Sequence, residues 1–269
     1  MTRPLLALAL AALALSTLSF TNTGRQRGSL VLFGGDAAPD DGLIEALALT
    51  EAVSPNVLII PQASSADDRG QEAVAMWRKL GVNAKLLEPL DRRDAHAMLE
   101  ACDLIWFSDG SSQDLMRRLA KHALVSKVTS LYGQGKVIAA IGDCITAAGV
   151  ITLLPSETPQ PLVSSSGRTT RGLGLWPTGM VENRFLERDR YANLLSAVLK
   201  KPRQLGVGVG DEAALIVQGN ELRVVGEGQV VIFDARQADV TRVGQGERQT
   251  GRGVQLHVLR GGDSWVWLE

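Results

Sequence analysis

The sequence predicts an α/β fold, a doubly wound and mostly parallel sheet with additional antiparallel strands toward the C-terminus. Up to Gly149, short apolar runs of strand length alternate with longer stretches of helical period. The apolar runs are continuous, which indicates strands buried on both faces of a sheet. A strand, a helix and a second buried strand form a right-handed crossover between parallel neighbours. With 269 residues, 45% of them hydrophobic, the chain is long enough for a sizeable core.

Each predicted strand in this part of the chain is followed by a predicted helix. In chain order the pairs are SLVLFGG and GLIEALALTEAV, NVLIIPQ and QEAVAMWRKLG, AKLLEP and RDAHAMLEA, DLIWFSD and SQDLMRRLAKHALVSKVTSLYGQG, and KVIAAIG and ITAAGV. Pro61, Pro89 and several glycines follow the strand runs. They are predicted to cluster at the carboxyl edge of the sheet, where folds of this class form their crevices.

The texture of the sequence changes after Leu153. Residues 155–172 read PSETPQPLVSSSGRTTRG, which predicts a surface loop that is either a solvated excursion or a lid over a substrate. A helix is predicted from Glu187 to Lys200, and strand-like runs follow, with a hairpin signal at Gly219-Asn220. These runs, LGVGVG, AALIVQ, ELRVVG, QVVIFD and VQLHVL, are expected to add antiparallel strands to the same core. Residues 29–269 are therefore predicted to form a single α/β domain.

The N-terminus is predicted to be a signal peptide over residues 1–23. Arg3 precedes a nearly pure Leu/Ala run from Leu5 to Leu15, and small polar residues follow. The run is shorter than the about 20 apolar residues that span a bilayer, so an uncleaved anchor is the lesser alternative. We therefore expect an exported protein, periplasmic or extracellular. Cys102 precedes a buried strand and is expected to be a small hydrophobic side chain rather than a disulfide partner of Cys144.

Charge and ligand spacing exclude several classes of partner. The formal net charge is −1 and the sequence has no run of lysines or arginines, so we expect no nucleic acid partner and, once the leader is removed, no membrane partner. Two cysteines and three histidines are scattered and match no metal-ligand spacing. Gly206-x-Gly208-x-Gly210 leads into an acid and a strand rather than a helix, which argues against a dinucleotide loop. No metal and no cofactor are expected, and a homodimer is left open.

The stretch from Val137 to Thr146 has the context of a nucleophile elbow. An apolar strand leads into Gly142-Asp143-Cys144, and small residues that can open a helix follow. Such a turn exposes a nucleophile and presents backbone N–H groups to an oxyanion. Gly142-x-Cys144-x-Thr146 keeps the first glycine of G-x-S-x-G, replaces oxygen by sulfur and loses the last glycine. A structural strand-to-helix turn is the alternative.

Seven stretches occur in this order along the chain: LVLFGG, VLIIPQASS, IWFSDGSSQDLMRRL, IGDCITAAG, RGLGL, VENRFLERDRYANLL and GVGVGDEAALIV. Together they resemble the family of cyanophycinase and aspartyl dipeptidase (dipeptidase E), serine peptidases on a class I glutamine amidotransferase-like, flavodoxin-like fold. The family's corresponding runs are similar to IPTAS, FTGGDQ, GTSAGA, GLGL, D-x-HF-x-x-R-x-R and GIGIDE-x-TA. The resemblance covers nearly the whole predicted mature chain.

The resemblance implies roles for particular residues. Cys144 stands at the nucleophile, Glu212 at the acid of GIGIDE, Gly110 in the turn that shapes the oxyanion hole, and Arg184 where the family has its histidine. The candidates for binding substrate are Ser111, Ser112 and Gln113 after that turn, together with Arg168 and Arg171 in the Ser/Thr-rich loop.

The replacement of histidine by Arg184 leaves two functions open. Histidine can serve as both base and acid in amide hydrolysis, whereas arginine stays a cation and can do neither. Arg184 and a helix N-terminus could nevertheless lower the pKa of Cys144 and hold it as a thiolate. The chain is then either an exported peptidase-like hydrolase that uses Cys144, or an inactive relative that binds a carboxylate-bearing peptide or small molecule in the old cleft. Each of the three histidines, His96, His122 and His257, is more simply explained as a structural or solvated residue than as the base.

Overall fold

The structure is a computed structural model that describes residues 28–61, 69–87, 92–155 and 161–267. The predicted signal peptide, residues 1–23, and Pro89 lie outside the described residues. Within the described ranges, every helix is too short or too polar to cross a membrane.

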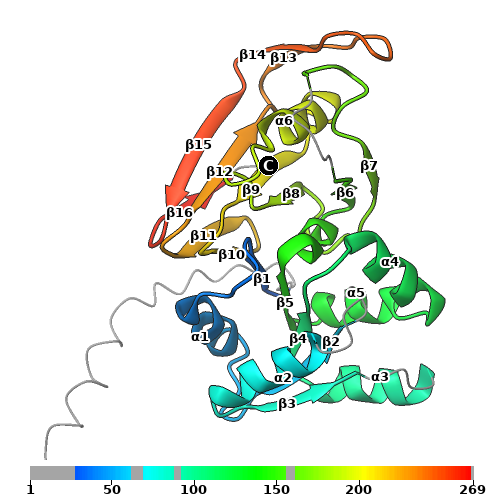
Figure 1. Cartoon of the computed structure of the whole chain (residues 1–269), viewed down its shortest axis with the longest axis vertical. Coiled ribbons are helices and arrows are strands. Elements are labelled where there is room, and N and C mark those ends of the chain that lie inside the picture. The colour runs from blue at the N-terminus through cyan, green and yellow to red at the C-terminus, as the bar shows by residue number, and fades with distance from the viewer. Residues whose placement is uncertain (1–27, 62–68, 88–91, 156–160, 268–269) are drawn as a thin grey trace, which may run out of the picture.

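The main sheet has eight strands and confirms the predicted doubly wound core. β1, β5, β4, β2 and β3 pair in parallel, and β10, β11 and β16 extend the sheet in antiparallel fashion beyond β1. In spatial order (Figure 1) the strands are β16 (Ser264–Val266), β11 (Glu221–Gly226), β10 (Ala213–Gln218), β1 (Leu30–Phe33), β5 (Val137–Ile141), β4 (Leu104–Phe107), β2 (Asn56–Ile60) and β3 (Asn83–Leu86). β10 and β11 meet in the predicted hairpin at Gly219-Asn220.

Helices cover both faces of the main sheet because its central strands are apolar on both sides. α1 (Asp40–Ala48) and α2 (Arg69–Lys79) bury Leu43 and Trp77 against one face. On the other face, α3 (Arg92–Ala101), α4 (Ser112–Lys121) and α5 (Val125–Gly133) bury an apolar row that includes Leu99, Leu115 and Val128. The continuous apolar runs therefore predict this layering correctly.

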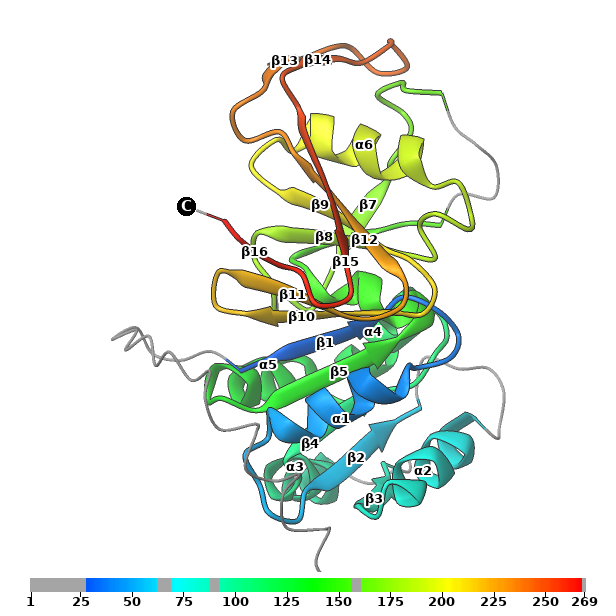
Figure 2. The ribbon, with the colours of Figure 1, turned by 90° about the vertical axis from the view of Figure 1, so that its left-hand side faces the viewer.

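A second sheet of four strands stands beside the main one, and it contains three of the five strands predicted after residue 204. Its order is β15 (Gln255–Arg260), β12 (Gln229–Asp234), β9 (Leu205–Val209) and β8 (Gly179–Asn183), with β8 and β9 parallel (Figure 2). One face of this second sheet packs into the same apolar cluster as α3, α4 and α5. The helix α6 (Tyr191–Lys200) packs on the other face. The residues of β9 (LGVGV) and β12 (QVVIFD) indicate burial but not which sheet each strand joins.

Two of the predicted helices have different bounds for backbone reasons. The long helix predicted after β4 is divided into α4 and α5, because Ala123 adopts a left-handed conformation with φ 54° and stops α4. The helix predicted from Glu187 begins only at Tyr191, after Asp189 at φ 48°. Residues with positive φ cannot continue a right-handed helix.

The Pro/Ser/Thr-rich loop is partly ordered into a small ribbon. Thr169–Arg171 forms β7, which pairs with β6 (Ile151–Leu153). The Nζ of Lys200 on α6 donates to the carbonyl oxygens of Ser164, Ser166 and Gly167, the last at 2.7 Å. The described part of the loop is therefore fastened to α6. A second ribbon, β13 (Asp239–Thr241) with β14 (Thr250–Arg252), lies beyond α6.

A buried polar network ties α6 to β8. Arg190 pairs with Glu182 and donates to Asn183 Oδ1 at 3.3 Å, while the Nδ2 of Asn193 donates to Glu182 Oε2 at 3.0 Å. The Glu182 side chain is 1% exposed and that of Arg190 10%. Burial raises the pKa of the Glu182 carboxyl, and the guanidinium of Arg190 acts in the opposite direction. The network fixes the end of β8, from which residue 184 enters the crevice.

Glu182→Gln should lower the free energy of unfolding by about 3–5 kcal/mol, because it leaves the buried guanidinium of Arg190 without a counter-charge. Guanidinium titration followed by tryptophan fluorescence measures the loss. Glu45→Gln is the matched control, since the Glu45–Arg223 pair has side chains 33% and 35% exposed and should lose at most about 1 kcal/mol. Equal losses in the two variants would contradict the structural role of the buried network.

Candidate functional site

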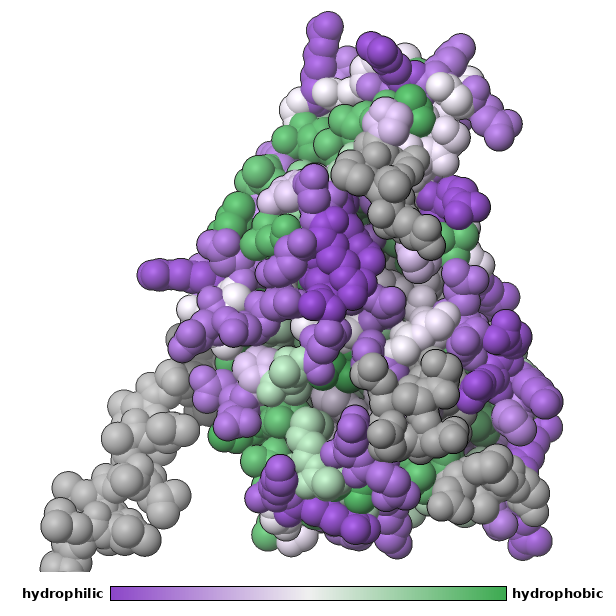
Figure 3. All heavy atoms as spheres, in the orientation of Figure 1, coloured by the Kyte–Doolittle hydropathy of each residue, from purple (hydrophilic) through white to green (hydrophobic). Residues whose placement is uncertain are grey.

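The candidate site lies where the carboxyl ends of five strands meet. β1, β4, β5, β8 and β9 end next to Asp36, Asp109, Asp143, Arg184 and Asp211, respectively. On the face seen in Figure 3, strongly hydrophilic side chains gather at mid-height, beside β8 and the second sheet. The carboxyl edge, where the sequence predicts a crevice, therefore carries four carboxylates and the guanidinium of Arg184.

The two sheets meet at Gly34, with no space for a side chain. A Cβ on Gly34 would lie 2.2 Å from the carbonyl oxygen of Gly210. The backbone of Gly34 donates to the carbonyl of Ala213 at 3.0 Å and accepts the N–H of Arg184 at 3.1 Å. This contact brings β1, β9 and residue 184 to one point.

Cys144 is buried, and the turn conformation of an elbow falls two residues before it. The residue with positive φ after β5 is Gly142, at φ 64°, and Gly142–Ala148 continue as the 3₁₀ helix η1. Cys144 is 2% exposed, and its Sγ lies 3.1 Å from the carbonyl oxygen of Ser108 and 3.4 Å from that of Gly110. The thiol therefore points into the protein and is a hydrogen-bond donor to backbone carbonyls.

The surroundings of Cys144 favour the neutral thiol over the thiolate that the sequence leaves open. Burial raises the pKa of the Cys144 thiol well above its usual value, and the nearby carboxylates of Asp109 and Asp143 raise it further. Arg184 is not among the groups that act on this thiol. A protonated, buried thiol is a poor nucleophile.

Arg184 is held by two acids instead of by the cysteine. Its Nη1 donates to Asp36 Oδ2 at 2.6 Å, and its Nε lies 3.4 Å from Asp211 Oδ1. Its backbone is left-handed, with φ 44°, a strained conformation of the kind that gathers at functional sites. Burial raises the pKa of the Asp211 carboxyl, and Arg184 partly offsets this.

The acid that meets Arg184 is Asp211, whereas Glu212 is exposed in a left-handed turn at φ 58°. The sequence does carry a signal for this. Residues 206–211, GVGVGD, align with the GIGIDE pattern without a gap, which places Asp211 at the acidic position. Sequence reasoning also missed Arg188, whose Nη1 lies 3.5 Å from Asp143 Oδ1.

Gly110 lies in a turn at the crevice, with φ 143°. Its N–H donates to the side-chain oxygen Oδ1 of Asp109 at 2.7 Å, and the N–H of Asp143 donates to the same oxygen at 3.2 Å. The two N–H groups that face the crevice are thus bound to a carboxylate of the chain itself.

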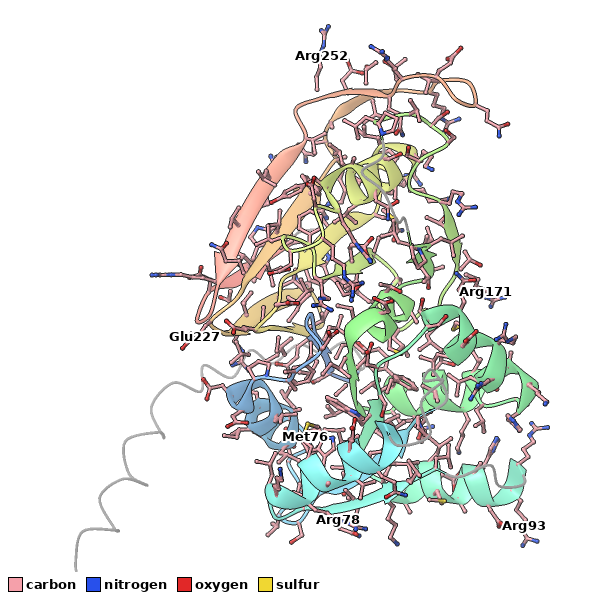
Figure 4. The ribbon with its side chains drawn as sticks, viewed as in Figure 1. Met76, Arg78, Arg93, Arg171, Glu227 and Arg252 are labelled. Atoms are coloured by element: carbon pink, nitrogen blue, oxygen red, sulfur yellow. The ribbon has the colours of Figure 1, made fainter. Side chains whose placement is uncertain are left out.

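The predicted substrate-binding residues separate into two places. Ser111 caps α4, accepting the N–H of Asp114 at 3.2 Å, while Ser112 is buried in its first turn and Gln113 is exposed. Arg168 and Arg171 are exposed on the Pro/Ser/Thr-rich loop. Arg171 points away from the body of the molecule (Figure 4), so the structure does not bring it to the Arg184 crevice.

The three histidines, all within the described ranges, lie away from the crevice. His96 is on α3, and His257 on β15 has its ring 4.9 Å from Trp265. His122 follows the last residue of α4, about 15 Å along the helix from Ser111. Among the described residues, no cluster of three metal-ligating side chains occurs, and Cys102 and Cys144 are both free.

Comparisons with known proteins identify relatives of the chain. A sequence profile described as "Peptidase family S51" matches residues 36–225. Two proteins named cyanophycinase are similar: one from Synechococcus elongatus, 30% identical over 226 residues covering 77% of this chain and 68% of that protein, and one from Geminocystis herdmanii (strain PCC 6308), 27% identical over 229 residues covering 78% and 81%.

The fold is also similar to that of a solved structure, a peptidase from an acI-B1 Actinobacterium. The TM-score is 0.65 at 20% identity, covering 91% of this chain and 98% of that one. The profile match and the cyanophycinase relatives confirm the resemblance to the cyanophycinase and aspartyl dipeptidase family, and the solved structure confirms the fold.

Cys144 should react slowly with iodoacetamide between pH 6 and 8 in the folded protein, because its raised pKa keeps the thiol protonated. The rate should still be low where an ordinary thiol ionises, at a pH of about 8.5, and should climb only at higher pH. A Cys102→Ala background isolates the signal, mass spectrometry follows it, and protein unfolded in guanidinium gives the reference rate. Arg184→Ala should leave the rate unchanged. Rapid labelling at pH 6 that becomes slower in Arg184→Ala would contradict this prediction and would support a thiolate at Cys144.

Proposed function

The chain belongs to peptidase family S51, and we propose that it is a member that does not hydrolyse amides and instead binds a small carboxylate-bearing peptide or amino-acid derivative in the crevice. The observation that carries this proposal is the buried Cys144 thiol, 3.1 Å from the carbonyl oxygen of Ser108. A nucleophile must reach a substrate carbonyl, and this sulfur faces its own backbone.

The described part of the crevice also lacks a histidine to carry a proton to and from the nucleophile. Arg184 stands at the histidine position of the D-x-HF pattern and contacts Asp211. The pairing of a basic residue with an acid is retained, but the proton transfer that a histidine would perform is lost. A guanidinium cannot accept the nucleophile's proton or return it to a leaving amine. The loss of a general acid/base costs about 10²- to 10⁴-fold in rate, in addition to the inaccessible sulfur.

The crevice carries both guanidinium groups and carboxylates, which suits a ligand with both a negative and a positive charge. The guanidinium of Arg188 has a side chain 38% exposed and only a long contact with Asp143, at 3.5 Å, so it is available to a ligand carboxylate. The carboxylates of Asp36 and Asp143, with side chains 55% and 35% exposed, can receive an ammonium group. A short peptide or amino-acid derivative offers both.

A second candidate function is hydrolysis through Cys144, and membership of a peptidase family favours it. The relatives named cyanophycinase are 27–30% identical to this chain, which supports a peptidase ancestry. For this function, η1 would have to turn the sulfur outward, and a proton carrier other than Arg184 would have to reach it. Export to the periplasm or the cell exterior belongs to either proposal and rests on the Leu/Ala run that follows Arg3.

Wild-type protein should release no more amine than a protein-free blank from aspartyl dipeptides or from cyanophycin, because Cys144 is buried and Arg184 replaces the histidine of the family. A fluorescent amine assay measures release, with Cys144→Ala as the matched control. Turnover in the wild type that disappears in Cys144→Ala would overturn the binding proposal in favour of the hydrolase.

Isothermal titration with an aspartyl dipeptide should show saturable binding, and Arg188→Ala should raise the Kd about tenfold or more. The loss of one hydrogen bond to a charged group is about 1.5–3 kcal/mol, and each 1.4 kcal/mol is tenfold. Arg171→Ala, an exposed arginine outside the crevice, is the control and should leave the Kd unchanged. Equal effects of the two variants, or an absence of binding, would argue against the crevice as the site.

A further inference from the structure

A backbone anion site in the crevice is already filled by a side chain of the protein. The N–H groups of Gly110 and Asp143 both donate to Asp109 Oδ1, at 2.7 and 3.2 Å. They come from the ends of two neighbouring parallel strands, β4 and β5. Two N–H groups converging on one oxygen form the arrangement that binds carboxylates and oxyanions in proteins.

The same oxygen occupies the space beside the elbow turn. A Cβ on Gly142 would lie only 2.0 Å from Asp109 Oδ1 and 2.5 Å from its carboxyl carbon. Gly142 also has the left-handed φ of 64° at the end of β5. A side chain at this turn position, where an elbow presents its nucleophile, would therefore collide with the Asp109 carboxylate unless that carboxylate moved, and it would strain the left-handed backbone as well.

We propose that the N–H groups of Gly110 and Asp143 form a carboxylate-binding site that Asp109 occupies from within the chain, and that Gly142, not Cys144, holds the turn position of the elbow. Charge-assisted hydrogen bonds to a carboxylate are shorter and stronger than neutral ones. A tethered carboxylate competes at an effective concentration in the millimolar range or above. Free carboxylates of weak affinity therefore do not displace Asp109 in the wild type.

This inference does not rest on the proposed function, because it concerns N–H groups and not the Arg188 contact. Asp109 is the residue that decides whether the site is open. With its carboxylate removed, the two N–H groups face the crevice without their anion, and a small carboxylate of the size of acetate fits the vacated position. The ligand class is thus a carboxylate, supplied by the chain in the wild type and by solution in a variant.

Acetate titration of ¹⁵N-labelled Asp109→Ala protein tests the site directly. The amide resonances of Gly110 and Asp143 should shift saturably with acetate, and chloride at equal ionic strength should leave them in place. The wild type should show no such shift over the same range. Asp36→Ala is the matched control, since it removes a carboxylate from Arg184 and not from the N–H pair. Absent shifts in Asp109→Ala, or equal shifts in the wild type, would overturn the proposal.

Thermal unfolding of Gly142→Ala tests the packing without relying on ligand binding. Gly219 is the control glycine, because it has a similar φ of 57° and nothing within 4 Å of an added Cβ. Gly219→Ala should lower Tm by about 2–8 °C from the left-handed backbone alone. Gly142→Ala should lower it at least about twice as much in the wild type, and by no more than the control in the Asp109→Ala background. Equal losses in both backgrounds would contradict the placement of Asp109.

Discussion

The site depends on the contact between the two sheets at Gly34, where backbone meets backbone with no side chain between. The ends of β1 and β9 approach closely enough that a Cβ there would lie 2.2 Å from the carbonyl oxygen of Gly210. Arg184, which directly follows β8 of the second sheet, donates its N–H to the same glycine. Its charged side chain therefore starts next to the end of β1 in the main sheet. The crevice is thus a junction between two sheets rather than the edge of one, and its charged residues come from both.

This contact between the sheets decides which charged groups lie next to one another in the crevice. Arg184 lies beside Asp211 and Asp36. These two acids neutralise its charge, and Arg184 does not lower the pKa of the Cys144 thiol. Cys144 lies below, among apolar neighbours, with carboxylates as its closest charges. The buried Nε of Arg184 and Oδ1 of Asp211 face each other at 3.4 Å without a hydrogen bond, so the pair is held by charge alone. A binding surface with both charge signs is what such an arrangement offers.

The parts of the fold that the sequence predicts are those with a local cause. Continuous apolar runs such as Leu104–Phe107 must be buried on both faces wherever they pair, and Gly219-Asn220 turns the chain within two residues. The second sheet could not be predicted because the alternation in β9 or β12 is the same whichever neighbour accepts its hydrogen bonds. The site shows the same limit. Residue types place a glycine, an acid and a cysteine after β5, whereas only the backbone dihedral angles reveal that the turn belongs to Gly142 and that Cys144 faces inward.

The burial of Cys144 has a consequence for the lifetime of the molecule. Oxidants attack the thiolate, and the path from sulfenic to sulfinic acid begins only where peroxide can reach it. The buried sulfur of Cys144, a residue of η1, is kept as a thiol and so protected from that chemistry, and so is Cys102, whose pKa burial raises to about 11. Both sulfurs are thereby preserved in their reduced form without a disulfide to protect them. The burial that withholds the Cys144 sulfur from a substrate thus also withholds it from oxidants.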